Sequence, residues 1–132
     1  MASILKVDTL TGVTTAGSIS VTGEGNSTTT NLQQGLCKVW AVRSTGATPS
    51  LSDGFNVSSI VDEGVGDTDY NITSSMSVVT NAFGVSNQNS ANRRGIYTDN
   101  ESTSKIRTLS YESTSSAGVD DAVSFTCFGD LA

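Results

Sequence analysis

The chain has 132 residues, of which 36% are hydrophobic, 6% aromatic and 15% charged, and its formal net charge is −6. This length accommodates one domain with a short additional segment, and the acidic balance excludes the basic surface that a nucleic-acid binder needs. The small apolar fraction, in a chain rich in Ser, Thr and Gly, predicts that neighbouring subunits supply part of the burial.

The first third of the chain predicts a thin N-terminal arm, residues 1–34. Short β segments are expected at 4–7, 12–13 and 18–21, followed by a polar junction with one helical turn around 32–34. These segments have too few apolar residues to bury a face alone. We therefore expect an assembly arm that contacts sister chains through Ile4, Leu5, Val7, Leu10, Ile19 and Val21; the alternative is an edge ribbon of a single domain.

Residues 35–132 predict a compact β-sandwich-like module, and the fold class is all-β. Alternating apolar residues and intervening turn signals predict strands at 36–42, 55–61, 70–76, 77–85, 96–98, 105–111 and 122–128. A turn is expected at Asp53–Gly54 and a loop at 86–95. Tyr70 and Ile72 are expected to share a face, as are Val123, Phe125 and Cys127. Trp40, in the most apolar strand, is expected to anchor the core.

The stretch VDEGVGDTD, residues 61–69, contains Asp62, Glu63, Asp67 and Asp69. The spacing does not fit a calcium-binding hand, because the later ligand positions fall on Gly64, Gly66 and Thr73, and it fits a calcium repeat only loosely. A hairpin with a glycine turn and solvated acids at its tip explains the stretch better.

No catalytic residue, cofactor or metal ligand is predicted. The sequence contains no His, which excludes a Ser-His-Asp triad, and Cys37 and Cys127 are isolated and expected to be reduced. Several carboxylates in expected loops could pair for glycoside hydrolysis, although no pair is singled out; these are Asp53, Asp62, Glu101, Glu112, Asp120 and Asp121. N-glycosylation patterns at Asn26, Asn56, Asn71 and Asn100 are discounted, because no secretion signal accompanies them.

Aromatic, amide and guanidinium side chains supply the candidates for a receptor or inter-subunit contact. Tyrosine rings stack on the apolar face of a sugar, amides bind hydroxyls, and arginines bind carboxylates. The candidate contact residues are Tyr70, Asn87, Gln88, Asn89, Arg93, Arg94, Tyr97 and Tyr111.

Several segments carry a family resemblance. The segments GLCKVWAV, LSDGFNVSSIVDEGVGDTDYNITSSM, SKIRTLSY and DDAVSFTCFGDLA resemble a small β-module at the C-termini of bacteriophage tail-fibre-type proteins. The opening SILKVDTLTG is similar to the start of short virion proteins in phages of aquatic bacteria. Together these segments cover most of the chain, which lacks a long shaft.

The resemblance implies a non-enzymatic virion-surface protein, made in the cytoplasm of the host bacterium. It implies a homotrimer with an intertwined N-terminal attachment segment and a β-sandwich-like head. The expected partners are other virion proteins, of tail or capsid, and a host-surface glycan; no nucleic acid and no membrane insertion is expected. The alternatives are a capsid decoration (cement) protein and a free-standing carbohydrate-binding module.

Overall fold

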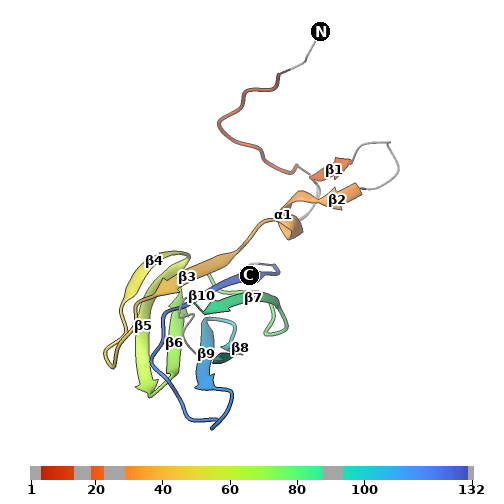
Figure 1. Cartoon of the computed structure of the whole chain (residues 1–132). Helices are drawn as coiled ribbons and strands as arrows, with labels where there is room; N and C mark the ends of the chain where they lie inside the picture. Colours follow the sequence, from red (N-terminus) through yellow and green to blue (C-terminus); the bar gives the residue numbers. More distant parts are fainter. Residues whose placement is uncertain (1–3, 14–18, 23–28, 88–93, 131–132) are drawn as a thin grey trace. The chain divides into compact units, whose positions relative to one another are not determined.

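The computed structural model describes residues 4–13, 19–22, 29–87 and 94–130. The chain divides into two compact units, Met1–Leu36 and Cys37–Ala132. The regular structure consists of β-strands and one four-residue helical turn (Figure 1). The prediction of an all-β fold is therefore confirmed.

The first unit contains a small two-stranded sheet. Strand β1 (Ser20–Thr22) pairs with β2 (Thr29–Asn31) in antiparallel fashion, and α1 (Leu32–Gly35) follows directly, as the predicted helical turn. Residues 4–13 form no strand. The β segments predicted at 4–7 and 12–13 are therefore wrong, because no described segment provides the hydrogen-bonding partner that a strand requires.

The second unit consists of two four-stranded antiparallel sheets. Sheet I has the order β4-β3-β10-β7, and sheet II the order β5-β6-β9-β8 (Figure 1). The strands of sheet I are β3 (Val39–Arg43), β4 (Leu51–Phe55), β7 (Ala82–Asn87) and β10 (Val123–Phe128). The strands of sheet II are β5 (Val57–Gly64), β6 (Asp67–Ile72), β8 (Arg94–Ser102) and β9 (Lys105–Glu112).

The core lies between the two sheets. Val39 and Phe125 of sheet I belong to one buried cluster with Tyr70 and Ile106 of sheet II. The rings of Tyr70 and Phe125 meet edge to face, with centroids 4.8 Å apart. Buried residues alternate along β10, which confirms that Val123, Phe125 and Cys127 share a face. Tyr70 and Ile72 also share a face of β6, as predicted, and both are buried.

Trp40 does not anchor this core, which corrects the prediction. Along β3 the buried residues are Val39, Ala41 and Arg43, while Trp40 is only half-buried and lies on the outer face of sheet I. The interior accepts Arg43 because its guanidinium donates a hydrogen bond to Thr68 of sheet II and lies 3.9 Å from an Asp120 carboxylate oxygen. A buried charge with such partners can occupy a core position.

The turn predicted at Asp53–Gly54 is also wrong, since both residues belong to β4. The chain leaves sheet I at Asn56, whose φ is 60°. Asn56 stabilises this corner by donating to the carbonyl oxygen of Lys38 over 3.2 Å and by accepting from the backbone N–H of Ser74 over 2.7 Å. Asparagine tolerates the left-handed conformation better than most residues.

One further strand prediction needs adjustment, whereas the prediction for the cysteines is confirmed. The strand predicted over 77–85 begins only at Ala82, because residues 77–81 form a loop in which Asn81 donates a hydrogen bond to the Val78 carbonyl oxygen. Cys37 and Cys127 are free thiols, as expected. Cys127 is fully buried, and burial together with the neighbouring Cys37 raises its pKa to about 11.

Candidate functional site

The outer face of sheet II brings together side chains from three strands in cross-strand rows. In one row Tyr97 of β8 pairs with Leu109 of β9, which pairs with Asp67 of β6. In the next row Arg107 of β9 pairs with Asp69 of β6. Residues directly opposite one another in antiparallel strands project to the same face, so aromatic, apolar and charged groups meet there.

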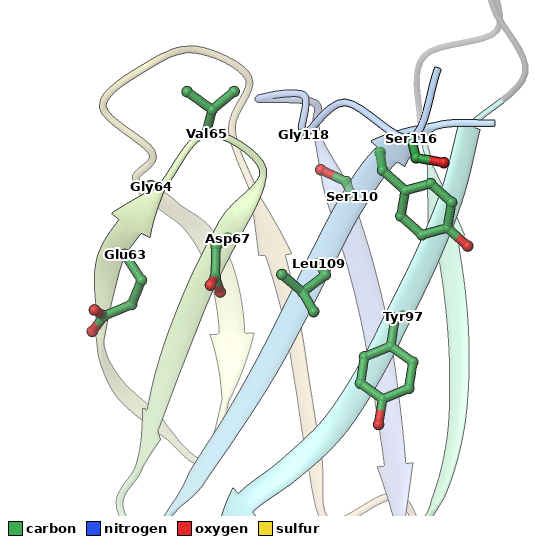
Figure 2. A pocket seen from close by; sticks show the side chains of 10 residues that line it. Glu63, Gly64, Val65, Asp67, Tyr97, Leu109, Ser110, Ser116 and Gly118 are labelled. Carbon is green, nitrogen blue, oxygen red and sulfur yellow. The ribbon is translucent and has the colours of Figure 1, made fainter. Parts of the chain in front are cut away.

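An open depression of about 710 Å³ lies on this face (Figure 2). Its lining comes from the β5–β6 hairpin, from β8, and from β9 with the segment after it; it includes Glu63, Val65, Asp67, Tyr97, Leu109 and Tyr111. Figure 2 shows Leu109 between Asp67 and the ring of Tyr97. The described lining contains carboxylates but neither Lys nor Arg, so this surface is acidic and partly aromatic.

Backbone contacts fix the hairpin wall of the depression. The N–H of Gly66 donates to Asp120 Oδ1 over 2.8 Å, and the Gly66 carbonyl oxygen accepts from the N–H of Ser110 over 2.8 Å. Gly66 has a φ of +79°, in the left-handed region that favours glycine. The position of this wall therefore depends on one main-chain hydrogen bond and on one to the Asp120 carboxylate.

Both tyrosine rings of the depression are held by contacts within the protein. The Tyr97 hydroxyl donates to Asp99 Oδ2 over 3.0 Å. Tyr111 covers its cross-strand partner Gly95, where an added Cβ would lie 2.6 Å from the phenolic oxygen and closer still to the ring. Tyr97 is 52% exposed and Tyr111 37% exposed. The two rings are thus accessible and positioned.

Beside the depression lies a carboxylate–cation cluster, which consists of Asp67, Asp69, Glu101, Lys105 and Arg107. Arg107 donates to Asp69 from Nε over 2.7 Å and from Nη2 over 3.1 Å. Lys105 Nζ lies 3.0 Å from an oxygen of Asp69 and 3.0 Å from an oxygen of Glu101. Because Asp69 is fully buried and receives both cations, it is the centre of the cluster, and its bidentate pairing with Arg107 is of the strong kind.

The two aspartates of the cluster have opposite pKa shifts. Burial raises the pKa of Asp67; Arg107 opposes this rise, whereas Asp69 and Glu101 add to it. Burial also acts to raise the pKa of Asp69, but hydrogen bonds from Arg107 and Lys105 outweigh it and hold the pKa below the ordinary 3.8. Asp67 Oδ1 is buried and makes no hydrogen bond in the described structure, although Arg107 Nε lies 3.4 Å from it. A perturbed carboxyl group in a depression is typical of a functional site.

Replacing Asp69 by asparagine is expected to lower the free energy of unfolding at pH 7 by about 1.5–3 kcal/mol, because Arg107 and Lys105 lose a shared charged acceptor. The lowered pKa means that the contribution of Asp69 is complete above pH 3.8 and is lost as the pH falls through the folded-state value. Denaturant unfolding at a series of pH values should therefore show the difference from wild type shrinking below pH 3.8.

The matched variant Asp67→Asn tests the same link between pKa and stability, with the opposite expected effect on the free energy of unfolding. Because the pKa of Asp67 is raised, its charge costs stability above that raised value, and the cost is relieved as the pH falls through it. Asp67→Asn is therefore expected to maintain or increase stability at pH 7. Equal losses in the two variants would contradict the assignment of Asp69 as the centre of the cluster.

The structure places the predicted contact residues in different environments. Tyr70 is fully buried, so it cannot contact a receptor and the prediction for it is wrong. Asn87 donates to Asp121 over 3.3 Å, and Arg94 Nε lies 2.7 Å from the same carboxylate, so both have intramolecular partners. Of the predicted contact residues that the structure describes, Tyr97 and Tyr111 line the depression. Other predicted positions lie outside the described residues: Ser18, Asn26, Gln88, Asn89 and Arg93.

The carboxylates considered for catalysis are dispersed over the module. Asp53, Glu101 and Glu112 belong to strands rather than loops, and Asp120 and Asp121 have the arginine partners described above. In the described part of the chain, no group of His, Cys, Asp or Glu is arranged to hold a metal ion. The acidic stretch does form the predicted hairpin, but its acids are not all solvated, because Asp69 is buried.

The sequence identifies neither Leu109 as part of the depression nor Gly95 as the residue that Tyr111 covers. Leu109 was assigned to a strand without a face, and Gly95 to a loop. Two-residue spacing in the sequence indicates that Tyr97 shares a face with Asp99, and that Leu109 shares a face with Tyr111. It does not show that these two pairs are neighbours, which depends on the β8–β9 register.

Comparisons with protein-family models, with curated proteins and with solved structures give no match for this chain. Among the residues that the structure describes, no helix has the length and apolar character needed to cross a membrane.

Proposed function

We propose that the chain is a non-enzymatic structural protein of a bacteriophage virion. It forms a homotrimeric fibre or spike, attached through its N-terminal segment, with the β-sandwich at the virion surface and in contact with the host. The observation that carries the proposal is a run of exposed apolar side chains, Ile4, Leu5, Val7 and Leu10, of which Leu5 is 80% exposed. The family resemblance of the sequence supplies the setting.

Exposure of these apolar side chains to water is unfavourable, and burying each of them stabilises the assembly by roughly 1.5–3 kcal/mol. Val21 of β1 is also exposed, and Ile19 is half-buried. In the proposal, sister chains and a neighbouring virion protein bury these exposed apolar side chains. The segment is therefore an assembly arm, and trimer formation and attachment depend on it.

The mass of the protein in solution tests this proposal. Analytical ultracentrifugation of the full chain is expected to give three chains per particle. A variant with Ile4, Leu5 and Val7 replaced by serine is expected to shift the mass toward one chain, because the arm loses the apolar area that it buries. Deletion of residues 1–24 should have the same effect while circular dichroism retains the β signal of the module.

A matched control changes exposed valines of the module, Val78→Ser and Val79→Ser, which are about as exposed as Val21. This control should remain trimeric. A wild-type monomer contradicts the proposal, and aggregation of the shortened chain shows instead that the segment is part of the module's own sheet.

Attachment to the tail or to the capsid is decided by mixing the protein with purified tails and with purified capsids. Binding to tails, lost on deletion of residues 1–24, supports a fibre. Binding to capsids alone supports the alternative, a capsid decoration protein.

A further inference from the structure

We propose that the depression on sheet II binds a neutral pyranose unit of a saccharide. The inference rests on the proposed function for its setting, contact with the host surface, and on this face for its chemistry. Three properties of the face select this ligand: exposed rings, carboxylate oxygens that can accept hydrogen bonds, and the absence of Lys and Arg from the described lining.

The rings match the apolar side of a sugar. A pyranose presents C–H groups on its faces, and tyrosine rings offer a flat apolar surface of similar size. Tyr97 and Tyr111 are both exposed, and Leu109, the cross-strand partner of Tyr97, extends the apolar floor between them and Asp67. This floor belongs to two adjacent strands, so its parts keep their spacing.

The carboxylates match the hydroxyl edge of the sugar. Glu63 and Asp67 both line the depression, and ionised carboxylates accept hydrogen bonds from hydroxyls. Asp67 Oδ1 makes no hydrogen bond in the described structure, and its ion-pair contact with Arg107 Nε is 3.4 Å long. The carboxylate of Asp67 therefore retains the capacity to accept a hydrogen bond from a ligand hydroxyl.

The charge of the lining selects against acidic sugars. Beside the depression, Lys105 and Arg107 of the cluster are engaged by Asp69 and Glu101, and Arg107 Nε also lies 3.4 Å from Asp67 Oδ1. A uronic acid or a sulfated sugar would therefore meet the carboxylates of Glu63 and Asp67, and the described lining offers it no Lys or Arg of its own. Neutral sugars avoid this repulsion.

The site is also preorganised. The Gly66 contacts hold one wall, Asp99 holds Tyr97, and the close approach of Tyr111 to Gly95 holds the second ring. A ligand then binds without first ordering these groups, which lowers the entropic cost of binding.

Isothermal titration calorimetry on the full chain tests the inference. The probes are neutral oligosaccharides of glucose, galactose, mannose and N-acetylglucosamine, with oligogalacturonate as the acidic comparison. At least one neutral probe is expected to bind and oligogalacturonate is not. Tyr97→Ala and Tyr111→Ala are each expected to weaken binding about tenfold or more, whereas Phe55→Ala, which changes an exposed aromatic residue of sheet I, should leave it unchanged.

Two milder variants separate stacking from folding. Tyr97→Phe keeps the ring and is expected to retain most of the affinity. Gly95→Ala displaces the ring of Tyr111 without adding a group to the depression, and is expected to weaken binding while circular dichroism is unchanged. Binding that survives loss of either ring, preference for the acidic probe, or no binding of any neutral probe overturns the inference.

The oligomer mass, measured on the same sample, separates this inference from the proposed function. A trimer that binds no neutral saccharide refutes the site and leaves the fibre proposal intact. A monomer that binds one refutes the fibre and retains the site. If hydrogen exchange shows that a sister chain covers Tyr97 and Tyr111 in the trimer, the face is an inter-subunit contact and the saccharide site is refuted.

Discussion

Replacement of Phe125 by alanine is expected to lower the free energy of unfolding of the sandwich by about 3–5 kcal/mol. The side chain of Phe125 is 2% exposed and its ring meets Tyr70 of the opposite sheet edge to face. Removal of the ring loses the free energy gained by burying its apolar surface. It also leaves a cavity between the sheets that the strands cannot close without moving. Denaturant unfolding followed by circular dichroism, at one fixed protein concentration, measures the loss.

Phe128→Ala is the matched control. Phe128 lies on the same strand, but it projects from the opposite face and is 38% exposed. We expect a loss of less than about 1 kcal/mol, because little buried area is removed. Similar losses in the two variants would contradict the assignment of the inner face of β10.

Replacement of Gly66 by alanine is expected to lower the free energy of unfolding by about 2–5 kcal/mol. A left-handed φ of +79° costs a residue with a side chain about 1–2 kcal/mol. An added Cβ would also collide with the Ser110 carbonyl oxygen and lie 2.6 Å from the Val119 nitrogen. Both are main-chain atoms, so relieving the overlap shifts backbone, at a cost of about 1–3 kcal/mol. The melting temperature and the denaturant midpoint should both fall.

Gly64→Ala separates the two contributions. Gly64 belongs to the same hairpin and also has a positive φ, +145°, but a Cβ there meets nothing within 4 Å. Gly64→Ala should therefore lower the free energy of unfolding only by the cost of placing alanine at a positive φ. If Gly64→Ala is as harmful as Gly66→Ala, the contact between the hairpin tip and the segment after β9 is not important for stability.

The sequence predicts strand positions where the residues of one strand face are apolar and those of the other face are polar. In β10 the residues Val123, Phe125 and Cys127 alternate with Ser124 and Thr126, and this pattern indicates both the strand and its inner face. The hairpin of 57–72 was equally predictable, because a glycine turn separates two segments with β periodicity.

Strand β3 shows where this reasoning fails. Its two phases are Val39, Ala41 and Arg43 on one side, and Trp40 and Val42 on the other. Side-chain size and the charge of Arg43 favour burying Trp40. The observed phase depends on Thr68 and Asp120, which lie far away in the sequence and provide partners for the guanidinium. Local periodicity carries no information on such partners.

The candidate site was predictable only as a pair of tyrosines. Tyr97 and Tyr111 were proposed as contact residues, but Tyr70 was included with them because exposure cannot be read from residue type alone. Leu109 and Asp67 join the tyrosines through the registers β8–β9 and β6–β9. These registers depend on tertiary pairing, which a single sequence does not specify.

Strand β5 is an edge of sheet II, and its shape affects how the protein behaves when crowded. Its pairing with β6 is irregular in two places, between Val57 and Ser59 and between Asp62 and Gly64. Asp62 and Glu63 add exposed negative charges at the second irregularity. Irregular, charged edges discourage a further strand from adding to the ladder. Sheet II should therefore resist edge-to-edge aggregation at this strand, even where many copies are held close together.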